Sequence, residues 1–385
     1  MASNTPLPGA ESRMLTANSA AALLSAVDYV LLDIDGVLWS GDHVFEGAAE
    51  TLEWLRSVGK NIRFLSNNST MSRESTAKKF VKKGFIGVTA AEIYTSGYAA
   101  AQYLKHLNSG RTDSSSLLDA NVFIVGEAGL HEEIGKVLSP GRFTYGLELN
   151  GVEYEPNRMA QALTQRVLPP PRHLVGSCTT PQTSIEELDC SVVVAGLDLH
   201  FNMTKLACAG LCFQQARYTQ SIGGTLAHDD KNKKKEDDEK PLLIATHQNS
   251  TMRFVATNED PQFPVGGDGV LLPGAGCIVN SVSTVAGRRP DVVCGKPHIN
   301  LAKILFEVEG IKDPKRCLMI GDRLSTDIAF GNGAGCRTMM VLTGCETRAH
   351  VDEEAKRGHA MMLPDYIAPS LAALWMQGNR QIAKL

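Results

Sequence analysis

The sequence predicts an α/β protein with a doubly wound, Rossmann-like parallel sheet, and the order of its expected elements carries this prediction. Short apolar runs, such as residues 29–34, alternate with helix-like segments through the first third of the chain, and the same rhythm resumes after residue 290. Strands that alternate with helices pair in parallel, because each helix crosses back over the sheet. We expect one sheet built from residues 1–120 and 290–385, with residues 121–289 forming an inserted α/β domain.

Length and composition favour a globular protein with more than one domain. The chain has 385 residues, more than one ordinary hydrophobic core holds. Its net charge of −4 gives no reason to expect nucleic acid or an anionic membrane as a partner, and no apolar run approaches the length that spans a bilayer. The nine cysteines form no Cys-x-x-Cys motif. This pattern favours reduced thiols in an intracellular protein over disulfides or a zinc knuckle.

The first 120 residues contain the expected strand–helix pairs. Residues 20–24 belong to a first helix, since no basic segment precedes them as in a signal peptide. Ser72 is an N-cap candidate, and Gly59 and Gly84 stand where glycine ends helices. The expected strands lie at 29–34, 61–65 and 93–96, and the expected helices at 45–58, 73–83 and 97–107.

A polar segment at residues 109–116 marks the first domain boundary, and a second α/β region follows it. Residues 229–240 carry mixed charges and no apolar side chain, so they cannot offset their ordering entropy by burial. We predict a disordered insertion near residues 227–252. The expected strands are 121–125, 191–195, 253–256, 291–294, 318–320 and 339–342, and the expected helices 130–137, 206–218, 277–286 and 299–308.

Polar residues follow four of the expected strands. The carboxyl ends of parallel strands meet at one edge of a sheet, where ligands bind in open α/β folds. We therefore expect these side chains to converge, with Gly36 allowing close approach of the backbone. The groups are Asp33 and Asp35, then Ser66, Asn67 and Asn68, then Lys296, and last Asp322 and Asp327.

These residue types fit phosphoryl chemistry. Clustered carboxylates favour a hard cation such as Mg²⁺, and a lysine with hydroxyl and amide groups can hold a phosphoryl group. One of two neighbouring acids, Asp33 or Asp35, can attack a substrate while the other moves a proton. Taken singly, Asp322 could be a helix cap and Lys296 a surface lysine, but four strand ends carry such groups together.

The four groups resemble, in order, the four motifs of the haloacid dehalogenase superfamily. Within that superfamily the chain is most similar to the p-nitrophenylphosphatase, phosphoglycolate phosphatase and pyridoxal phosphatase group. The resemblance covers roughly residues 28–345. It is carried by residues 33–36, 65–69, 194–198, 255–260, 294–297 and 321–327.

The resemblance implies a Mg²⁺-dependent phosphatase that hydrolyses small phosphate monoesters. Asp33 would be the nucleophile that becomes a phospho-aspartate, and Asp35 the general acid and base. Mg²⁺ would bind Asp33, the backbone carbonyl of Asp35 and Asp322, while Asp327 would orient that shell. Ser66, Asn67, Asn68 and Lys296 would bind the phosphoryl group.

The resemblance also assigns residues 121–289 to a cap domain that closes over the site and selects the leaving group. Pyridoxal phosphatases of the group carry histidine just before a proline in the cap loop, where this chain has Phe263. Phe263 is thus expected to contact a substrate of the phosphoglycolate type, and pyridoxal phosphate is the alternative. A homodimer through the cap is a further expectation.

The same residues also allow alternative interpretations, in which the protein catalyses a different reaction or only binds a partner. A phosphotransferase or mutase would also use Asp33 and Asp35, whereas a dehalogenase would not need Asp35. A non-catalytic binding protein would be expected to lack one of these acids, and a transport ATPase would carry membrane segments. The chain ends in Ala383-Lys384-Leu385, a variant of the peroxisomal Ser-Lys-Leu signal, so we expect a cytoplasmic or a peroxisomal/glycosomal location.

Overall fold

A computed structural model describes most of the chain. The described residues are 13–109, 121–152, 157, 164, 167–172, 183–222, 252–265 and 270–382. Of the predicted insertion near 227–252, Met252 alone is among them. Residues 110–116 of the predicted linker and the C-terminal tripeptide, residues 383–385, also lie outside the described residues.

The core is a seven-stranded sheet in the order β1-β18-β17-β16-β2-β5-β6. Every neighbouring pair in it is parallel, which confirms the predicted doubly wound fold. Its strands are β1 (Arg13–Met14), β2 (Tyr29–Asp33), β5 (Asn61–Ser66), β6 (Ile93–Thr95), β16 (Cys317–Gly321), β17 (Arg337–Val341) and β18 (Tyr366–Ala368).

Strand β2 is an interior strand of this sheet, between β16 and β5, and it is buried on both faces. Val30 and Leu32 pack in one apolar cluster with residues of α1 (Ala17–Ala26), α2 (Ala48–Ser57) and α13 (Ala372–Ile382). Leu31 points to the opposite face and packs with residues of α4 (Ser96–Ser109) and α10 (Asn300–Glu309). Helices thus cover both faces, and the strand ends remain at the sheet edge. The remaining core helices are α3 (Arg73–Lys82), α11 (Ala329–Ala334) and α12 (Arg348–Arg357).

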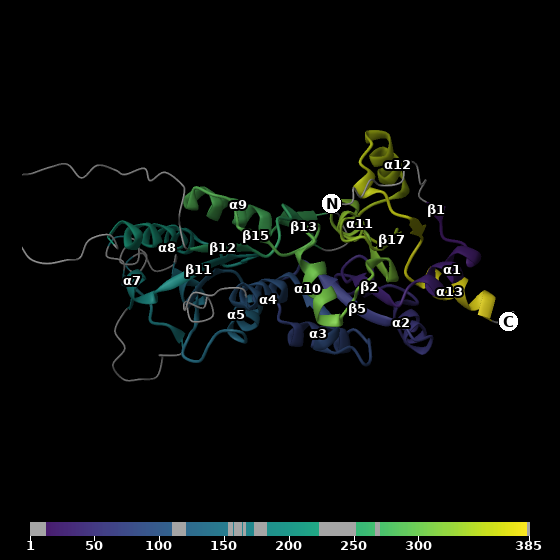
Figure 1. The fold of residues 1–385 in the computed structure, drawn as a ribbon, viewed down its shortest axis with the longest axis horizontal. Helices are drawn as coiled ribbons and strands as arrows, with labels where there is room; N and C mark the ends of the chain where they lie inside the picture. The colour runs from purple at the N-terminus through teal and green to yellow at the C-terminus, as the bar shows by residue number, and fades with distance from the viewer. Residues whose placement is uncertain are drawn as a thin grey trace, which may run out of the picture.

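A second parallel sheet, in the order β15-β12-β11-β7-β8, lies beside the core along the long axis of the molecule (Figure 1). We call residues 121–293 the inserted unit. Its sheet strands are β7 (Asn121–Val125), β8 (Thr144–Tyr145), β11 (Cys190–Ala195), β12 (Arg253–Ala256) and β15 (Val292–Val293). Its helices are α5 (Ala128–Gly135), α7 (Ile185–Leu188), α8 (Met203–Ile222) and α9 (Ala275–Ala286). Two further pairs of strands are antiparallel: β9 (Val167–Leu168) pairs with β10 (Thr183–Ser184), and β13 (Gln262–Val265) pairs with β14 (Val270–Pro273).

One strand belongs to a different sheet from the one expected. The sequence predicts that the strand before Lys296 lies in the same sheet as the strands that precede the other polar groups of the site. This prediction is wrong, because β15 pairs with β12 at the edge of the second sheet. The predicted start of the core at residue 290 therefore precedes the last strand of the inserted unit. A short apolar strand fits either sheet, and its partner depends on where the chain emerges from α9. Lys296 thus lies on the connection that returns from the inserted unit to the core.

The described residues also bear on the membrane and cysteine predictions. None of the described helices is long and apolar enough to cross a bilayer. Each described cysteine is a free thiol, as the sequence predicts.

Candidate active site

Loops from both units meet beyond the carboxyl ends of their strands. Several contacts join the loop after β5 to the inserted unit. The Gly129 N–H donates to the Thr70 carbonyl (3.2 Å), and the Ser69 hydroxyl lies 3.4 Å from the Thr257 hydroxyl. The Asn258 side chain donates to the Asn67 carbonyl (2.8 Å). The edge of the core sheet that carries the predicted site therefore faces the inserted unit.

Three of the predicted carboxylates converge at this edge. Asp33 ends β2, Asp322 follows β16, and Asp327 lies in a short π-helix, η8 (Leu324–Ile328). One oxygen from each lies within 4.8 Å of the others. The Lys296 ammonium donates hydrogen bonds to Asp33 Oδ1 (2.7 Å) and Asp327 Oδ1 (2.6 Å). Lys296 is thus buried between two carboxylates although it arrives from the other sheet.

The carboxylate of Asp322 is confined by two glycines. Gly36 has φ +89°, and a Cβ there would lie 2.4 Å from Asp322 Oδ2; at Gly344 the distance would be 1.9 Å. The Cys345 N–H donates to the same oxygen (2.8 Å). Asp322 Oδ1 is buried and has no hydrogen-bond partner among the described residues. A buried acceptor without a partner is costly unless a ligand meets it.

The electrostatics of this cluster favour a cation. Burial, reinforced by Asp327, raises the pKa of Asp33 well above its ordinary value and that of Asp322 to about 6. Burial opposes the charge of Lys296, but Asp327 and Asp33 outweigh it and raise the pKa of the ammonium. Carboxylates crowded with one ammonium and a partnerless buried oxygen are a donor set that suits a divalent ion such as Mg²⁺.

The side chain of Asp35 points elsewhere. Its Oδ1 accepts a 2.8 Å hydrogen bond from the indole of Trp39, and the Lys79 ammonium is 3.9 Å away. Trp39 lies in a small hairpin of β3 (Trp39–Ser40) and β4 (His43–Val44). The Asp35 side chain is half exposed and outside the carboxylate cluster of Asp33, Asp322 and Asp327. It is therefore free to face a ligand that enters from solvent.

The predicted phosphoryl-binding residues have different surroundings. The Ser66 hydroxyl is buried and accepts from the Asn68 N–H (3.1 Å). The Asn68 side chain accepts from the N–H and hydroxyl of Thr70 (2.8 and 2.7 Å), as in a turn. The Asn67 side chain binds the backbone of Lys296 and the carboxylate of Asp260. Asn67 and Asn68 thus shape the loop through their side chains.

Phe263 lies in β13, opposite Leu272 of β14, in a hairpin that follows the loop beginning at Thr257. Its side chain is half-buried. Sequence reasoning missed two neighbours of the site, Trp39 and Asp260. Both stand next to matched motifs, Trp39 three residues after Gly36 and Asp260 at the end of segment 255–260, and this proximity is the signal that could have identified them.

Comparison with known proteins decides the family. A model described as haloacid dehalogenase-like hydrolase matches residues 30–137, and one described as HAD-hydrolase-like matches residues 293–374. Phosphoglycolate phosphatase 2 of Arabidopsis thaliana is 31% identical over 362 residues, which cover 94% of this chain and 96% of that protein. The chain belongs to the haloacid dehalogenase-like hydrolases. The predicted resemblance is confirmed.

One further relative supports the class of enzyme, and one solved structure supports the fold. A 4-nitrophenylphosphatase of Schizosaccharomyces pombe is 30% identical over 350 residues, covering 90% of this chain and 93% of its own. A glycerol phosphate phosphatase of Mycobacterium tuberculosis, solved in complex with magnesium, has a TM-score of 0.60 at 24% identity and supports the fold, covering 94% of this chain and 78% of its own. This haloacid dehalogenase-like hydrolase is a phosphatase.

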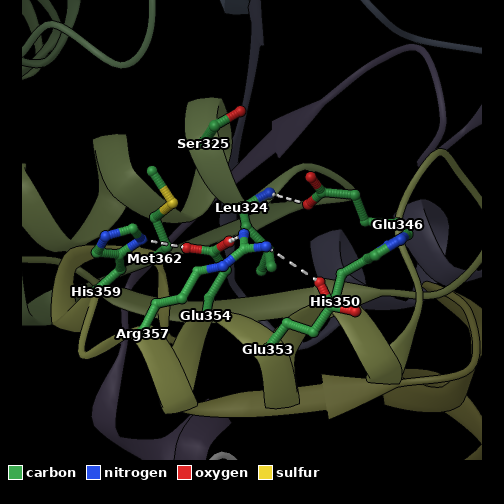
Figure 2. A pocket seen from close by; sticks show the side chains of 9 residues that line it. All are labelled: Leu324, Ser325, Glu346, His350, Glu353, Glu354, Arg357, His359 and Met362. Carbon is green, nitrogen blue, oxygen red and sulfur yellow. Dashed lines mark hydrogen bonds and ion pairs between the residues drawn. The ribbon is translucent and has the colours of Figure 1, made fainter.

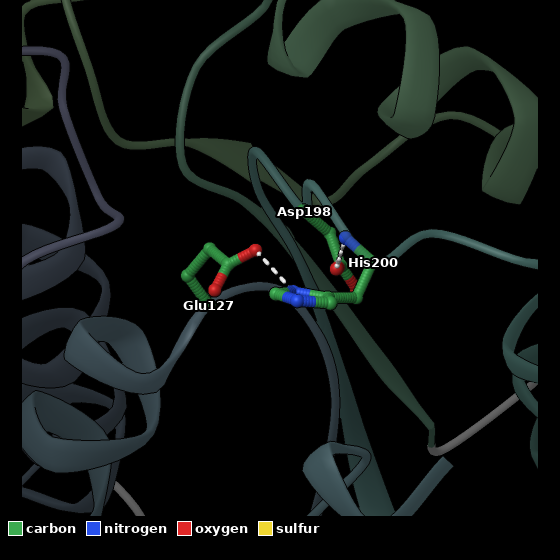
Figure 3. Close-up of side chains that lie close together, drawn as sticks. All are labelled: Glu127, Asp198 and His200. Atoms are coloured by element: carbon green, nitrogen blue, oxygen red, sulfur yellow. Dashed lines mark hydrogen bonds and ion pairs between the residues drawn. The ribbon is translucent and has the colours of Figure 1, made fainter. Parts of the chain in front are cut away.

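A second group of metal-binding residue types lies in the inserted unit (Figure 3). Glu127 Oε1 accepts from His200 Nδ1 (3.0 Å), and Asp198 Oδ1 accepts from the His200 N–H (2.9 Å). Asp198 Oδ2 pairs with the buried ammonium of Lys205 (2.5 Å). Protein donors thus engage both oxygens of Asp198, and the group holds the loop after β11 in place.

A pocket of about 350 Å³, lined mostly by charged and histidine residues, lies on the core beside η8 (Figure 2). Charged side chains that line the pocket form ion pairs with one another. Arg357 pairs with Glu353 (3.5 Å) and Glu354 (2.6 Å), and His359 pairs with Glu354 (2.5 Å). Glu346 accepts from the Leu324 N–H. The Glu346 contact joins the start of η8, which carries Asp327, to the loop that precedes α12.

Proposed function

We propose that this phosphatase hydrolyses small phosphate monoesters through a phospho-Asp33 intermediate and depends on Mg²⁺. The observation that carries the proposal is the convergence of Asp33, Asp322 and Asp327 around the ammonium of Lys296. A dehalogenase would need neither the second acid, Asp35, nor the metal, and a non-catalytic binding protein would be expected to lack Asp33 or Asp35.

Asp33, Asp322 and the backbone carbonyl of Asp35 would hold Mg²⁺, and Asp327 would fix its surroundings through Lys296. Bound Mg²⁺ would supply positive charge that keeps the carboxylates ionised and draws electron density from the phosphoryl oxygens. Asp322 Oδ1, the buried oxygen without a described partner, is the group that most needs such a ligand.

The reaction has two displacements at phosphorus. In the first, an Asp33 oxygen bonds to phosphorus while the bond to the ester oxygen breaks, and Asp35 gives a proton to the leaving alkoxide. In the second, Asp35 takes a proton from water, which bonds to phosphorus while the bond to Asp33 breaks. The Ser66 hydroxyl, the backbone amide of Asn67 and the Lys296 ammonium would hold the phosphoryl oxygens during both steps.

The inserted unit would act as the cap that excludes water and contacts the leaving group. Phe263 presents an apolar surface where pyridoxal phosphatases carry histidine, so a compact substrate of the phosphoglycolate or p-nitrophenyl phosphate type fits better than pyridoxal phosphate. The relatives named for phosphoglycolate and 4-nitrophenyl phosphate support the same choice.

The test is phosphate release from p-nitrophenyl phosphate and from phosphoglycolate. Wild-type protein should release phosphate in the presence of Mg²⁺, lose this activity when EDTA is added and regain it when Mg²⁺ is restored. Asp33→Asn should abolish release while the circular dichroism spectrum stays unchanged. Turnover by Asp33→Asn, or indifference to EDTA, would reject the mechanism. Phosphate transfer to an added alcohol without release to water would favour the phosphotransferase alternative.

A further inference from the structure

Two residues of the core hold the carboxylate of Asp260, which belongs to the inserted unit. The Asn67 side chain donates a 2.8 Å hydrogen bond to Asp260 Oδ2, and the Arg323 guanidinium lies 3.9 Å from the same oxygen. Both charged side chains are largely shielded, with 17% of Asp260 and 28% of Arg323 exposed. A partly desolvated hydrogen bond to a carboxylate is stronger than one at an open surface.

Asn67 connects this contact to Lys296. Its Oδ1 accepts from the Lys296 N–H (2.8 Å), and its Nδ2 donates to the Lys296 carbonyl (2.9 Å). The side-chain amide of asparagine has two N–H donors, so one can donate to the Lys296 carbonyl and the other to the Asp260 carboxylate. The amide that holds the Lys296 backbone therefore also binds the carboxylate of Asp260.

On its other side, Asp260 is fixed to the base of the β13–β14 hairpin. Its N–H donates to Asn258 Oδ1 (3.0 Å), and its carbonyl accepts from the Gly276 N–H (2.8 Å). A Cβ at Gly274 would lie 2.3 Å from that carbonyl oxygen, so the turn is closely packed. A displacement of the inserted unit must therefore move Asp260 as well.

We propose that Asp260 is a positioning residue that couples the seating of the inserted unit on the core to the placement of Lys296, through the Asn67 amide; this rests on the proposed phosphatase function. When the unit is seated, Asp260 occupies one Asn67 donor and neutralises Arg323. When Asp260 is absent, the Asn67 amide can turn away from Lys296, and Arg323 offers its charge to an anionic substrate instead. Catalysis then weakens while ground-state binding of the substrate does not.

The test compares Asp260→Ala, Asp260→Asn and the control Glu259→Gln. Glu259 is next in sequence but contacts His298 (3.3 Å) and Arg289 (4.0 Å), away from Asn67. With p-nitrophenyl phosphate, Asp260→Ala should lower kcat about tenfold with KM equal or lower. Asp260→Asn keeps an acceptor for Asn67 and should retain kcat within about threefold, and Glu259→Gln should match wild type. A wild-type kcat in Asp260→Ala would overturn the proposal, as would equal impairment of both variants with a raised KM.

Hydrogen exchange at the Lys296 amide provides a readout that does not require activity. The amide should exchange at least about tenfold faster in Asp260→Ala than in wild type, and at the wild-type rate in Glu259→Gln. Unchanged exchange in Asp260→Ala would refute the coupling even if the enzyme is a phosphatase. If wild-type protein releases no phosphate, the proposed function fails, and this exchange still decides whether Asp260 acts through Asn67. Asp260→Leu, which also lacks an acceptor for Asn67, supplies the same comparison if Asp260→Ala does not fold.

Discussion

The indole N–H of Trp39 donates a 2.8 Å hydrogen bond to Oδ1 of Asp35. The donor is rigid, because Trp39 is fully buried and its ring packs on Phe80 (4.8 Å between centroids) and Phe85 (5.5 Å). The hydrogen bond fixes one carboxylate oxygen of the proposed general acid and base, and leaves the other to exchange a proton with the substrate.

Trp39→Phe should therefore lower kcat with little loss of stability. Phenylalanine retains most of the aromatic packing but cannot donate to Asp35. A hydrogen bond to a charged group contributes about 1.5–3 kcal/mol, so a decrease in kcat on the order of tenfold or more is expected. Steady-state kinetics and thermal unfolding measure the two effects. Trp54→Phe, a change in α2, should leave kcat unaltered, and a wild-type kcat in Trp39→Phe would remove this role.

Gly344→Ala should abolish the stabilisation of the protein by Mg²⁺. The new Cβ would lie 1.9 Å from Asp322 Oδ2, and the carboxylate cannot retreat because Gly36 borders it on another side. For wild type, Mg²⁺ at about 100 times its dissociation constant adds about 2.7 kcal/mol to the free energy of unfolding. Thermal unfolding with and without Mg²⁺ measures this. The control Gly135→Ala places its Cβ in open space and should respond to Mg²⁺ like wild type.

Lys296→Met should be strongly destabilising. Asp327 is fully buried, and the ammonium 2.6 Å from its Oδ1 is its counterion. Removing one partner of a buried ion pair costs about 3–5 kcal/mol. Urea unfolding should show the loss, and the double variant Lys296→Met/Asp327→Asn should recover part of it by removing the unpaired charge. Lys303→Met, at an exposed position of α10, is the matched control. Unchanged stability in Lys296→Met would show that Asp327 does not depend on this lysine.

The inserted unit should lose stability in mild acid because of His131. Burial, assisted by Lys205 and Arg172, lowers the pKa of His131 to about 3, while its ordinary value is 6.5. The folded state therefore prefers neutral imidazole. The associated stability is fully present above pH 6.5 and declines as the pH falls towards 3, by about 2 kcal/mol between pH 7 and pH 5.

Urea unfolding of wild type and His131→Gln at these two pH values isolates this effect. The variant cannot titrate at this position, so its stability should change by about 2 kcal/mol less than that of wild type. His359→Gln, at an exposed position that pairs with Glu354, should keep the wild-type difference. Equal pH dependence in wild type and His131→Gln would contradict the assignment.

The amino-acid sequence by itself determined the parallel core sheet, because its strands are short apolar runs that suit burial on both faces. It also placed Asp33, Asp322 and Asp327 at one edge, since the carboxyl ends of parallel strands lie at the same edge of a sheet, and the structure pairs β2 with β16. Both features follow from local patterns, namely the period of the apolar residues and the polar groups that end each run.

Only the tertiary structure decided which side chains face the proposed ligand site and which form hydrogen bonds to other residues of the protein. Lys296 reaches Asp33 from a strand of the other sheet, Asn67 uses its amide to hold Lys296 and Asp260, and Asp35 turns to Trp39. Sequence spacing cannot predict the partners of Lys296 and Asn67, because these contacts join segments whose relative position depends on how two separately packed sheets dock. The hydrogen bond from Trp39 to Asp35 spans only four positions, and it depends on how Trp39 packs against Phe80 and Phe85. The physical reason is the range of the interaction: strand patterns act over a few residues, whereas Asn67 and Lys296 meet across 229 positions of the chain.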